Sequence, residues 1–343
     1  MKPTKAIDRV ILAHGGGGEL MSRLIREHLI PAISNERLAP LTDGAVLPRP
    51  DGGLVFTTDS YVVTPLEFPG GDIGRLAVAG TVNDLSVMGA TPLALSLGLI
   101  LEEGLPFEVL DRIVASIAAT AREAGVEIVT GDTKVIERRS TTGADGLFIN
   151  TAGVGVLGPE VRLGMEHIRP GDAILINGTL ADHGLTVMSR RHGIEFETEL
   201  RTDAAPLNHL LRRLFDSGAS VRFIRDATRG GVAGVLADIS EHARVSVEID
   251  EKRLPISPTA RHAAEMLGLD PLTVANEGKI VCVVAGADAA KAVQAMRSEP
   301  YGAAAAMIGT ITDTKPPLVE LLTTAGGRRV VQRPYGEDLP RIC

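Results

Sequence analysis

The sequence has 343 residues, of which 44% are hydrophobic and 23% charged, as is usual for a soluble globular protein. Its formal net charge of −8 argues against nucleic acid as the main partner, because a phosphate backbone binds clustered Lys and Arg. A charged N-terminus and the lack of an apolar run of ~20 residues predict neither a signal peptide nor a membrane span. We therefore expect a cytoplasmic protein that binds no membrane.

The first half of the sequence alternates strand-like and helical patterns. A glycine-rich segment, residues 15–18, precedes a stretch with helical spacing at residues 19–29. Asp72 is suited to cap a helix at its start and Gly125 to end one. The patterns predict strands and helices in this order: strand 54–58, helix 72–88, strand 93–101, helix 107–124, strand 126–130 and strand 147–157.

A second alternating unit follows a break at residues 158–171, where the turn signals Gly158-Pro159 and Pro170-Gly171 occur. It comprises strand 173–176, loop 177–184, helix 205–216, strand 221–224, helix 230–242, strands 245–249 and 279–285, and helix 288–298. We predict two α/β domains, at residues 41–158 and 170–315. A glycine-rich segment with a helix (1–40) precedes them, and a tail (326–343) follows.

The sequence ends in a cysteine, Cys343, within a proline-rich stretch of little apolar periodicity. Such a stretch is expected to be mobile, and a mobile arm ending in a thiol can carry a chemical group to a distant site. The alternative is an incidental terminal cysteine. The other cysteine, Cys282, lies in an apolar strand-like run and is expected to be a small buried hydrophobic residue.

Four aspartates are expected at strand-to-loop junctions, beside Gly, Ser, Thr or Asn. A magnesium ion bound to nucleotide phosphates prefers a small number of carboxylate oxygens. Any one of these aspartates could instead form a turn or cap a helix. Together they favour a magnesium–phosphate site formed by Asp59, Asp84, Asp132 and Asp226.

Two glycine-rich segments are candidate anion sites, since backbone N–H groups at the start of a helix can bind an anion. The first contains Gly15, Gly16, Gly17 and Gly18, for which a flexible lead-in is the alternative, because neither a P-loop nor a Rossmann signature is present. The second is Gly230-Gly231, which opens a predicted helix after Asp226 and Arg229.

Two further side chains could take part in proton or charge transfer. Lys134 follows Asp132 closely, so it could neutralise a phosphate or, if desolvated, act as a base. Glu277 precedes a buried strand and could present its carboxylate inward, cap a turn or face water.

As a set, these motifs resemble the HypE family of hydrogenase maturation proteins, the carbamoyl dehydratases. The ending Pro340-Arg-Ile-Cys343 is highly specific, whereas Asn83-Asp84-Leu and Asp226-Ala-Thr-Arg-Gly-Gly231 occur across a superfamily. This PurM-like superfamily includes aminoimidazole ribonucleotide synthetase, selenophosphate synthetase and thiamine-monophosphate kinase. Its usual Asp-Pro-Thr-Arg-Gly-Gly has Ala227 in place of proline here. The resemblance also includes His14-Gly-Gly-Gly-Gly18, Thr58-Asp-Ser60, Gly131-Asp-Thr-Lys134, Asp182-His-Gly184 and Asn276-Glu-Gly278.

The resemblance implies an α/β (α+β type), two-domain PurM-like fold with a C-terminal α/β domain and a flexible C-terminal tail. ATP would bind mainly to the N-terminal domain, and two such domains would form a β-barrel across a homodimer. A carbamoyltransferase, HypF, would load a carbamoyl group onto Cys343. ATP and Mg²⁺ would support its dehydration to a thiocyanate (S-cyanocysteine), and the cyano group would pass to iron on a HypC–HypD scaffold for NiFe-hydrogenase.

By the same resemblance, Asp59, Asp84, Asp132 and Asp226 bind magnesium and phosphate. Lys134 and Glu277 match positions that help to deprotonate the carbamoyl nitrogen. The other residues expected at the ATP site are Gly15, Gly16, Gly17, Gly18, Asn83, Gly131, Arg229, Gly230 and Gly231.

Two other functions stay open. A sibling kinase or synthetase acting on a free small molecule would keep full activity without its tail. A nucleotide-responsive carrier or scaffold would be modified at Cys343 without hydrolysing ATP.

Overall fold

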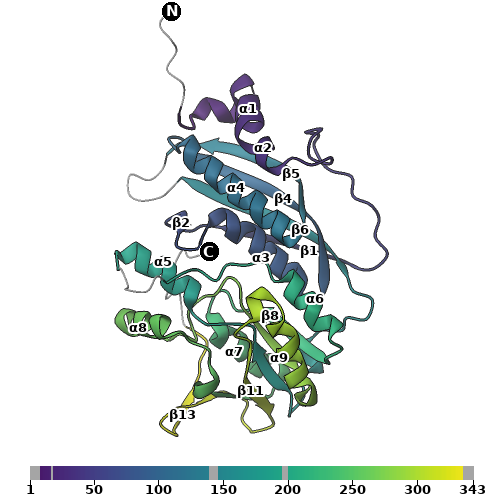
Figure 1. Ribbon diagram of the computed structural model, residues 1–343, viewed down its shortest axis with the longest axis vertical. Coiled ribbons are helices and arrows are strands. Elements are labelled where there is room, and N and C mark those ends of the chain that lie inside the picture. Colours follow the sequence, from purple (N-terminus) through teal and green to yellow (C-terminus); the bar gives the residue numbers. More distant parts are fainter. Residues whose placement is uncertain (1–7, 17, 139–145, 195–199, 335–343) are drawn as a thin grey trace, which may run out of the picture.

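The computed structural model describes residues 8–16, 18–138, 146–194 and 200–334. Two layered halves lie one above the other in Figure 1, with the N-terminal half at the top. The N-terminal half contains η1 (Leu12–Gly15), α1 (Glu19–Leu24), a π-helical turn (Ile25–Leu29), α2 (Ile30–Ile33), β1 (Leu54–Tyr61), β2 (Glu67–Phe68), β3 (Gly71–Asp72), α3 (Ile73–Val87), β4 (Ala90–Glu102), α4 (Phe107–Ala124), β5 (Glu127–Ile136) and β6 (Leu147–Leu157).

The N-terminal sheet has the strand order β1-β6-β4-β5. Strand β6 is antiparallel to both β1 and β4, whereas β4 and β5 are parallel and are joined through α4, as parallel neighbours require a crossover. The side chains of β1 alternate between the two faces, so Thr57, Asp59 and Tyr61 point inward while Phe56 and Ser60 point outward. The four strands form an open sheet, not a closed barrel.

Helices α3 and α4 cover the inner face of this sheet (Figure 1). Helix α3 is buried almost all round, because it lies between the sheet and the C-terminal half. The Asp72 side chain caps its start by accepting a hydrogen bond from the Arg75 N–H at 2.9 Å, which confirms the predicted cap. Helix α4 ends at a left-handed Gly125, as predicted.

The C-terminal half is built on a seven-stranded sheet of order β13-β12-β9-β11-β7-β10-β8, in which only β12 and β9 are parallel neighbours. The edge strand β8 contacts α3, which joins the two halves. Its elements are η3 (Met165–His167), β7 (Ala173–Ile176), α5 (Asp182–His192), α6 (Asn208–Asp216), β8 (Val221–Asp226), α7 (Gly231–Ala243), β9 (Ser246–Asp250), α8 (Pro258–Leu267), β10 (Ile280–Val284), α9 (Ala289–Arg297), β11 (Ala306–Thr312), β12 (Val319–Leu322) and β13 (Arg328–Val330).

Three sequence predictions about local structure were wrong. The strand expected to end at residue 130 continues through residues 131–134, which lie within the edge strand β5; an added Cβ at Gly131 would approach Leu97 O to 2.5 Å. The loop expected at residues 177–184 ends at Asp182, where α5 begins. The tail expected from residue 326 starts later, because β13 pairs with β12 and Val331 is buried.

Gly17 and residues 335–343, which include Cys343, lie outside the described residues. Within the described part of the chain, no helix combines the length and the apolar character that a membrane crossing requires.

Candidate active site

Four acidic side chains meet where the two halves join: Asp59 on β1, Asp84 on α3, Asp226 at the end of β8, and Glu277 in the segment before β10. Burial, followed by the charges of Asp226 and Asp59, raises the pKa of Asp84 to about 7. Burial also raises the pKa of Asp226, and the charge of Asp59 adds to this effect. The structure therefore brings together three of the four predicted aspartates and Glu277.

Hydrogen bonds fix two of these carboxylates. The Thr57 hydroxyl donates to Asp84 Oδ2 at 2.7 Å, and the Tyr61 hydroxyl donates to Asp59 Oδ2 at 3.2 Å. Neither donor was predicted from the sequence, although both lie two residues from Asp59 and so on the same face of β1. That two-residue spacing was the signal that could have found them.

Glu277 is the most deeply buried of the four acids, with 3% of its surface exposed. Among the described residues, its Oε1 atom has no hydrogen-bond partner. Burial raises the pKa of Glu277 well above its usual value, and the charges of Asp203, Asp226, Asp59 and Asp84 contribute in that order. A buried carboxyl group with a high pKa and a free oxygen is suited to accept or donate a proton.

The backbone around Glu277 is fixed by its neighbours. Asn276 donates to Ala227 O at 3.0 Å and accepts from the Ala181 N–H at 2.8 Å. Gly278 packs so closely that an added Cβ would lie 2.0 Å from Asp203 O. The segment therefore has little freedom to move its carboxylate.

Replacing Gly278 with alanine is expected to lower the free energy of unfolding by about 1–3 kcal/mol, since the new methyl group would clash with backbone atoms. Thermal unfolding would measure this. The matched control is Gly234→Ala in α7, where the nearest atom to an added Cβ is 3.6 Å away and no loss is expected. An unchanged unfolding temperature for Gly278→Ala would show that the packing is looser than described.

Asp132 and Lys134 lie elsewhere, on the outer face of the N-terminal sheet. The register places Asp132 opposite Gly98, Gly98 opposite Asn150, and Asn150 opposite Ser60. Directly opposed residues share a face, so Asp132 shares the face of Ser60, whereas its neighbour Asp59 points the other way. Three strand spacings, about 14 Å, separate Asp132 from β1.

Lys134 lies 3.2 Å from Asp132, and both side chains are largely exposed. Within a single chain, the predicted base Lys134 and the predicted ligand Asp132 are therefore separated by the sheet from the acidic cluster.

One predicted glycine segment lies near Lys134, and the other lies next to Asp226 of the acidic cluster. Gly15 packs against Val135 of β5, next to Lys134, where an added Cβ would come within 3.0 Å of the Val135 side chain; Gly16 and Gly18 flank the undescribed Gly17. Arg229, Gly230 and Gly231 connect Asp226 to α7, and both glycines have positive φ.

Asn83 joins the two halves. Its side-chain amide donates to Ala205 O at 3.0 Å and to Glu277 O at 3.4 Å, and accepts from the Leu207 N–H at 2.7 Å. Its contacts thus position Glu277 from the N-terminal side.

The described chain ends beside this site. An added Cβ at Gly230 would lie 3.9 Å from the Pro334 ring, so Pro334 lies next to the loop after Asp226. The preceding Arg333 pairs with Asp238 and, at 3.0 Å, with Glu241. Nine further residues separate Pro334 from the end of the sequence, a length that spans at most about 30 Å.

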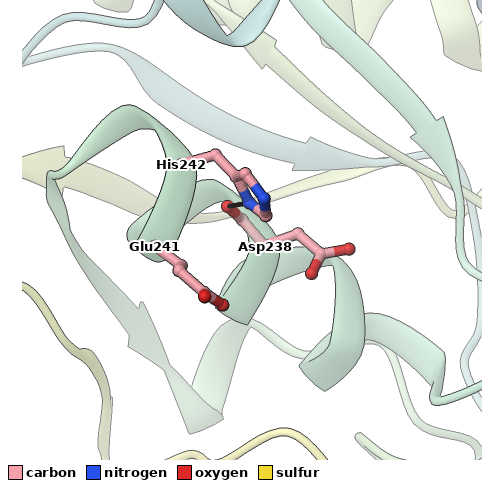
Figure 2. Close-up of side chains that lie close together, drawn as sticks. All are labelled: Asp238, Glu241 and His242. Carbon is pink, nitrogen blue, oxygen red and sulfur yellow. Dashed lines mark hydrogen bonds between the residues drawn. The ribbon is translucent and has the colours of Figure 1, made fainter.

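A second group of possible metal ligands, Asp238, Glu241 and His242, lies on α7 (Figure 2). Asp238 is paired with Arg225 at 2.6 Å and with Arg333. His242 Nδ1 lies 2.9 Å from the Asp238 carbonyl oxygen. These partners make it an ion-pair cluster that holds Arg333, not a metal site.

The acidic cluster has the chemistry of a magnesium site. Asp59, Asp84 and Asp226 offer only carboxylate oxygens, which Mg²⁺ prefers. Burial and neighbouring carboxylates keep the pKa values of Asp84 and Asp226 raised, although the charge of Arg225 opposes the shift at Asp226; a divalent cation would supply further positive charge to both groups.

Comparison with known proteins identifies the family. Residues 41–157 match the model for the N-terminal domain of AIR synthase related proteins, and residues 169–319 match the model for the C-terminal domain. Carbamoyl dehydratase HypE of Rhizobium leguminosarum bv. viciae is 47% identical over 336 residues, which cover 98% of this chain and 95% of that protein. The chain belongs to the HypE family. This confirms the resemblance inferred from the motifs.

Solved HypE structures share the fold. The crystal structure of hydrogenase maturation protein HypE in complex with ATP has a TM-score of 0.92 and 42% identity, and covers 97% of this chain and 99% of that one. HypE in a HypE–HypF complex has a TM-score of 0.78 and 45% identity, and covers 92% of this chain and all of that one. The predicted two-domain PurM-like α/β fold is thus confirmed.

Proposed function

We propose that this chain is an ATP-dependent carbamoyl dehydratase that converts a carbamoyl group on its own Cys343 into S-cyanocysteine. The observation that carries the proposal is Glu277, a buried carboxyl group with an unpartnered oxygen, beside three clustered aspartates. The chain approaches this cluster at Pro334, within reach of a nine-residue tether. The names of its relatives and the ATP complex of HypE support the same reaction.

The chemistry requires an activated oxygen and the removal of two protons from one nitrogen. The carbamoyl oxygen takes the γ-phosphoryl group of ATP and releases ADP while one N–H proton is lost. The C–O bond then breaks, phosphate leaves, and loss of the second proton completes the C≡N bond. Phosphorylation turns a poor leaving group into a good one, so the residues mainly position charges and accept protons.

Each predicted residue takes a part in this scheme. Glu277 accepts a proton from the carbamoyl nitrogen, and its burial excludes water from the activated intermediate. Lys134 stabilises phosphoryl charge or accepts the other proton. Asp59, Asp84 and Asp226 would hold Mg²⁺, which would supply positive charge to the phosphate oxygens. Asp132, which the sheet separates from them within one chain, would contribute only from a second copy of the chain. Gly15–Gly18, Asn83, Gly131 and Arg229–Gly231 are proposed as the remainder of the ATP site.

We also propose that the active form is a homodimer whose N-terminal sheets close a β-barrel. The outer face of the sheet exposes the large apolar side chains Leu54, Phe56 and Ile100, with Phe56 69% exposed. Apolar patches of this kind mark interaction surfaces. Asp132 and Lys134 lie on the same face, so a second copy would bring them close to a subunit boundary.

Replacing Phe56 with glutamate is therefore expected to change the dimer into a monomer, because it would bury a charge in the apolar interface. Light scattering would then give about the chain mass of 36.1 kDa in place of about twice that value. The matched control is Met266→Glu, at an exposed apolar residue on α8, which should leave the dimer intact. A monomeric wild-type protein would refute this part of the proposal.

The proposed partners are a HypF carbamoyltransferase, which supplies the carbamoyl group, and a HypC–HypD complex, which receives the cyano group for NiFe-hydrogenase. The HypE–HypF complex supports the first of these.

We further propose a cytoplasmic location, domain limits of 41–158 and 170–315, and a flexible tail.

The decisive experiment is the intact mass of the C-terminal peptide after incubation with the carbamoyltransferase, carbamoyl phosphate, Mg²⁺ and ATP. A second incubation separates the steps: the carbamoylated protein is desalted and then treated with or without ATP. An adduct that loses one water only with ATP supports the dehydratase. An adduct that never loses water would indicate a carrier, and no adduct would indicate a sibling kinase.

A further inference from the structure

A buried ion pair lies beside Glu277 and belongs to none of the motifs of the sequence. Lys279 Nζ is 2.9 Å from Asp203 Oδ2, and the two side chains are only 9% and 4% exposed. Lys279 follows Glu277 by two residues, whereas Asp203 comes from the segment before α6. Two distant parts of the chain are therefore held together at the candidate base.

Asp203 uses its second oxygen to bind the backbone of Glu277. The Glu277 N–H donates to Asp203 Oδ1 at 3.0 Å. The segment that carries Asp203 is itself tied to the N-terminal half, because the Thr202 N–H donates to Pro69 O at 2.9 Å and the Arg75 side chain donates to Ala204 O at 2.6 Å. One carboxylate thus fixes both the Glu277 backbone and the Lys279 ammonium group.

Stability alone gives no reason for such a pair. Removing two charges from water is costly, and replacing a buried ion pair with apolar residues is often neutral or stabilising. A role in the electrostatics of the neighbouring Glu277, whose Oε1 has no hydrogen-bond partner in the part of the chain that the structure describes, gives the pair a function.

We propose that Asp203 and Lys279 are positioning residues for Glu277. They hold the Glu277 backbone in place, and their opposite charges balance each other beside the Glu277 carboxyl group. The inference rests on the proposed function, in which Glu277 accepts a proton from the carbamoyl nitrogen.

The charged and titratable groups that act on Glu277 come from several elements. After burial, Asp203, Asp226, Asp59 and Asp84 all raise the pKa of Glu277, Asp203 most strongly. Tyr61, whose own pKa is raised by burial and by the charges of Asp59 and Glu277, faces the same cluster. Lys279 is the cation bound to Asp203. Removing one member of the pair would leave the charge of the other unbalanced.

The two single substitutions should therefore act in opposite directions. In Asp203→Asn, the remaining Lys279 cation lowers the pKa of Glu277, so a base that works when deprotonated stays active at lower pH. In Lys279→Met, the remaining Asp203 anion raises the pKa of Glu277, so the variant needs a higher pH to be active. We expect the acid limb of the rate–pH profile to move by about one pH unit to lower pH in Asp203→Asn and to higher pH in Lys279→Met. In the variant that carries both substitutions, the acid limb should return toward its wild-type position.

The measurement is the single-turnover rate of water loss from carbamoylated full-length protein after ATP addition, between pH 5 and pH 9. The matched control is Asp288→Asn, since Asp288 also pairs with a lysine at 2.9 Å and accepts a backbone N–H at 2.9 Å, but lies on the C-terminal half at α9. This control should leave the profile unchanged.

Shifts in the same direction, or an equal loss of rate at every pH, would overturn the proposal and leave a structural role. If Asp203→Asn does not fold, the comparison of Lys279→Met with Lys279→Arg tests the proposal. Arginine keeps the positive charge, so Lys279→Arg should have the wild-type pH profile, whereas Lys279→Met should not. A wild-type protein that never loses water refutes the proposed function instead. In that case the carboxyl ¹³C shift of Glu277, assigned by its loss in Glu277→Gln, still reports the opposite pKa shifts.

Discussion

Replacing Cys343 with serine is expected to abolish both the carbamoyl adduct and the cyano product. A thiolate is a strong nucleophile near neutral pH, whereas a serine hydroxyl needs a dedicated base to react. The proposed reaction also depends on the tether. In the proposed reaction, a group on Cys343 would be an intramolecular substrate for the acidic cluster, and short linkers can give effective concentrations in the millimolar range.

Mass spectrometry of the C-terminal peptide would measure the loss, with ATP binding measured in parallel to show that the variant is folded. The matched control is Cys282→Ala. Cys282 is fully buried in β10, and burial raises the pKa of its thiol, so it should carry no adduct and its loss should leave the reaction intact. An adduct of normal yield on the Cys343→Ser protein would overturn the assignment of the acceptor.

Much of the fold could be predicted from local patterns. Helix α4 was predicted with its full extent, because apolar residues recur at helical spacing and Gly125 ends it in the left-handed region. Strand β6 was predicted in the same way from a Val- and Gly-rich run between breaks. The order and pairing of the strands were not predicted, since pairing depends on contacts between distant residues.

The candidate site was predicted only in part, because it too depends on contacts between residues that are distant in the sequence. Asp59, Asp84 and Asp226 stood out because each lies among small residues in a recognisable motif. Asp203 has no such motif, and its importance comes from contacts with a segment 74 residues later in the sequence.

The separation of Lys134 from Glu277 could not be predicted from the sequence either. It follows from strand alternation combined with the register of four strands, and the register is set by the whole sheet. A motif places a residue in the chain but not on a face of the sheet.

Replacing Glu277 with glutamine is expected to slow water loss from the carbamoylated protein by about 10²–10⁴-fold, the usual contribution of a positioned general base. Loading of the carbamoyl group onto Cys343 and the affinity for ATP should stay close to wild type. Glutamine keeps the shape of the side chain and leaves the Glu277 backbone bond to Asp203 in place. The single-turnover rate after ATP addition measures the effect.

The same substitution should keep or raise the stability of the protein at neutral pH. Because the pKa of Glu277 is raised in the folded state, the unfolded state holds its proton less tightly, and stability falls as the pH rises from the unfolded toward the folded pKa. A neutral glutamine avoids that loss. Thermal unfolding at pH 7.5 should therefore give an equal or higher midpoint for Glu277→Gln, while at pH 4 the two proteins should unfold alike.

A matched control separates this role from burial alone. Glu102 is 4% exposed and, within residues 8–16, 18–138, 146–194 and 200–334 as described, also has a carboxylate oxygen without a hydrogen-bond partner, but it lies at the end of β4, away from the aspartate cluster. Glu102→Gln should therefore leave the rate of water loss unchanged. If Glu277→Gln reacts at the wild-type rate, Glu277 is not the base, and Lys134 becomes the remaining candidate for both protons. A slow but more stable Glu277→Gln protein would mean that the buried carboxyl group is kept for chemistry at a cost in stability.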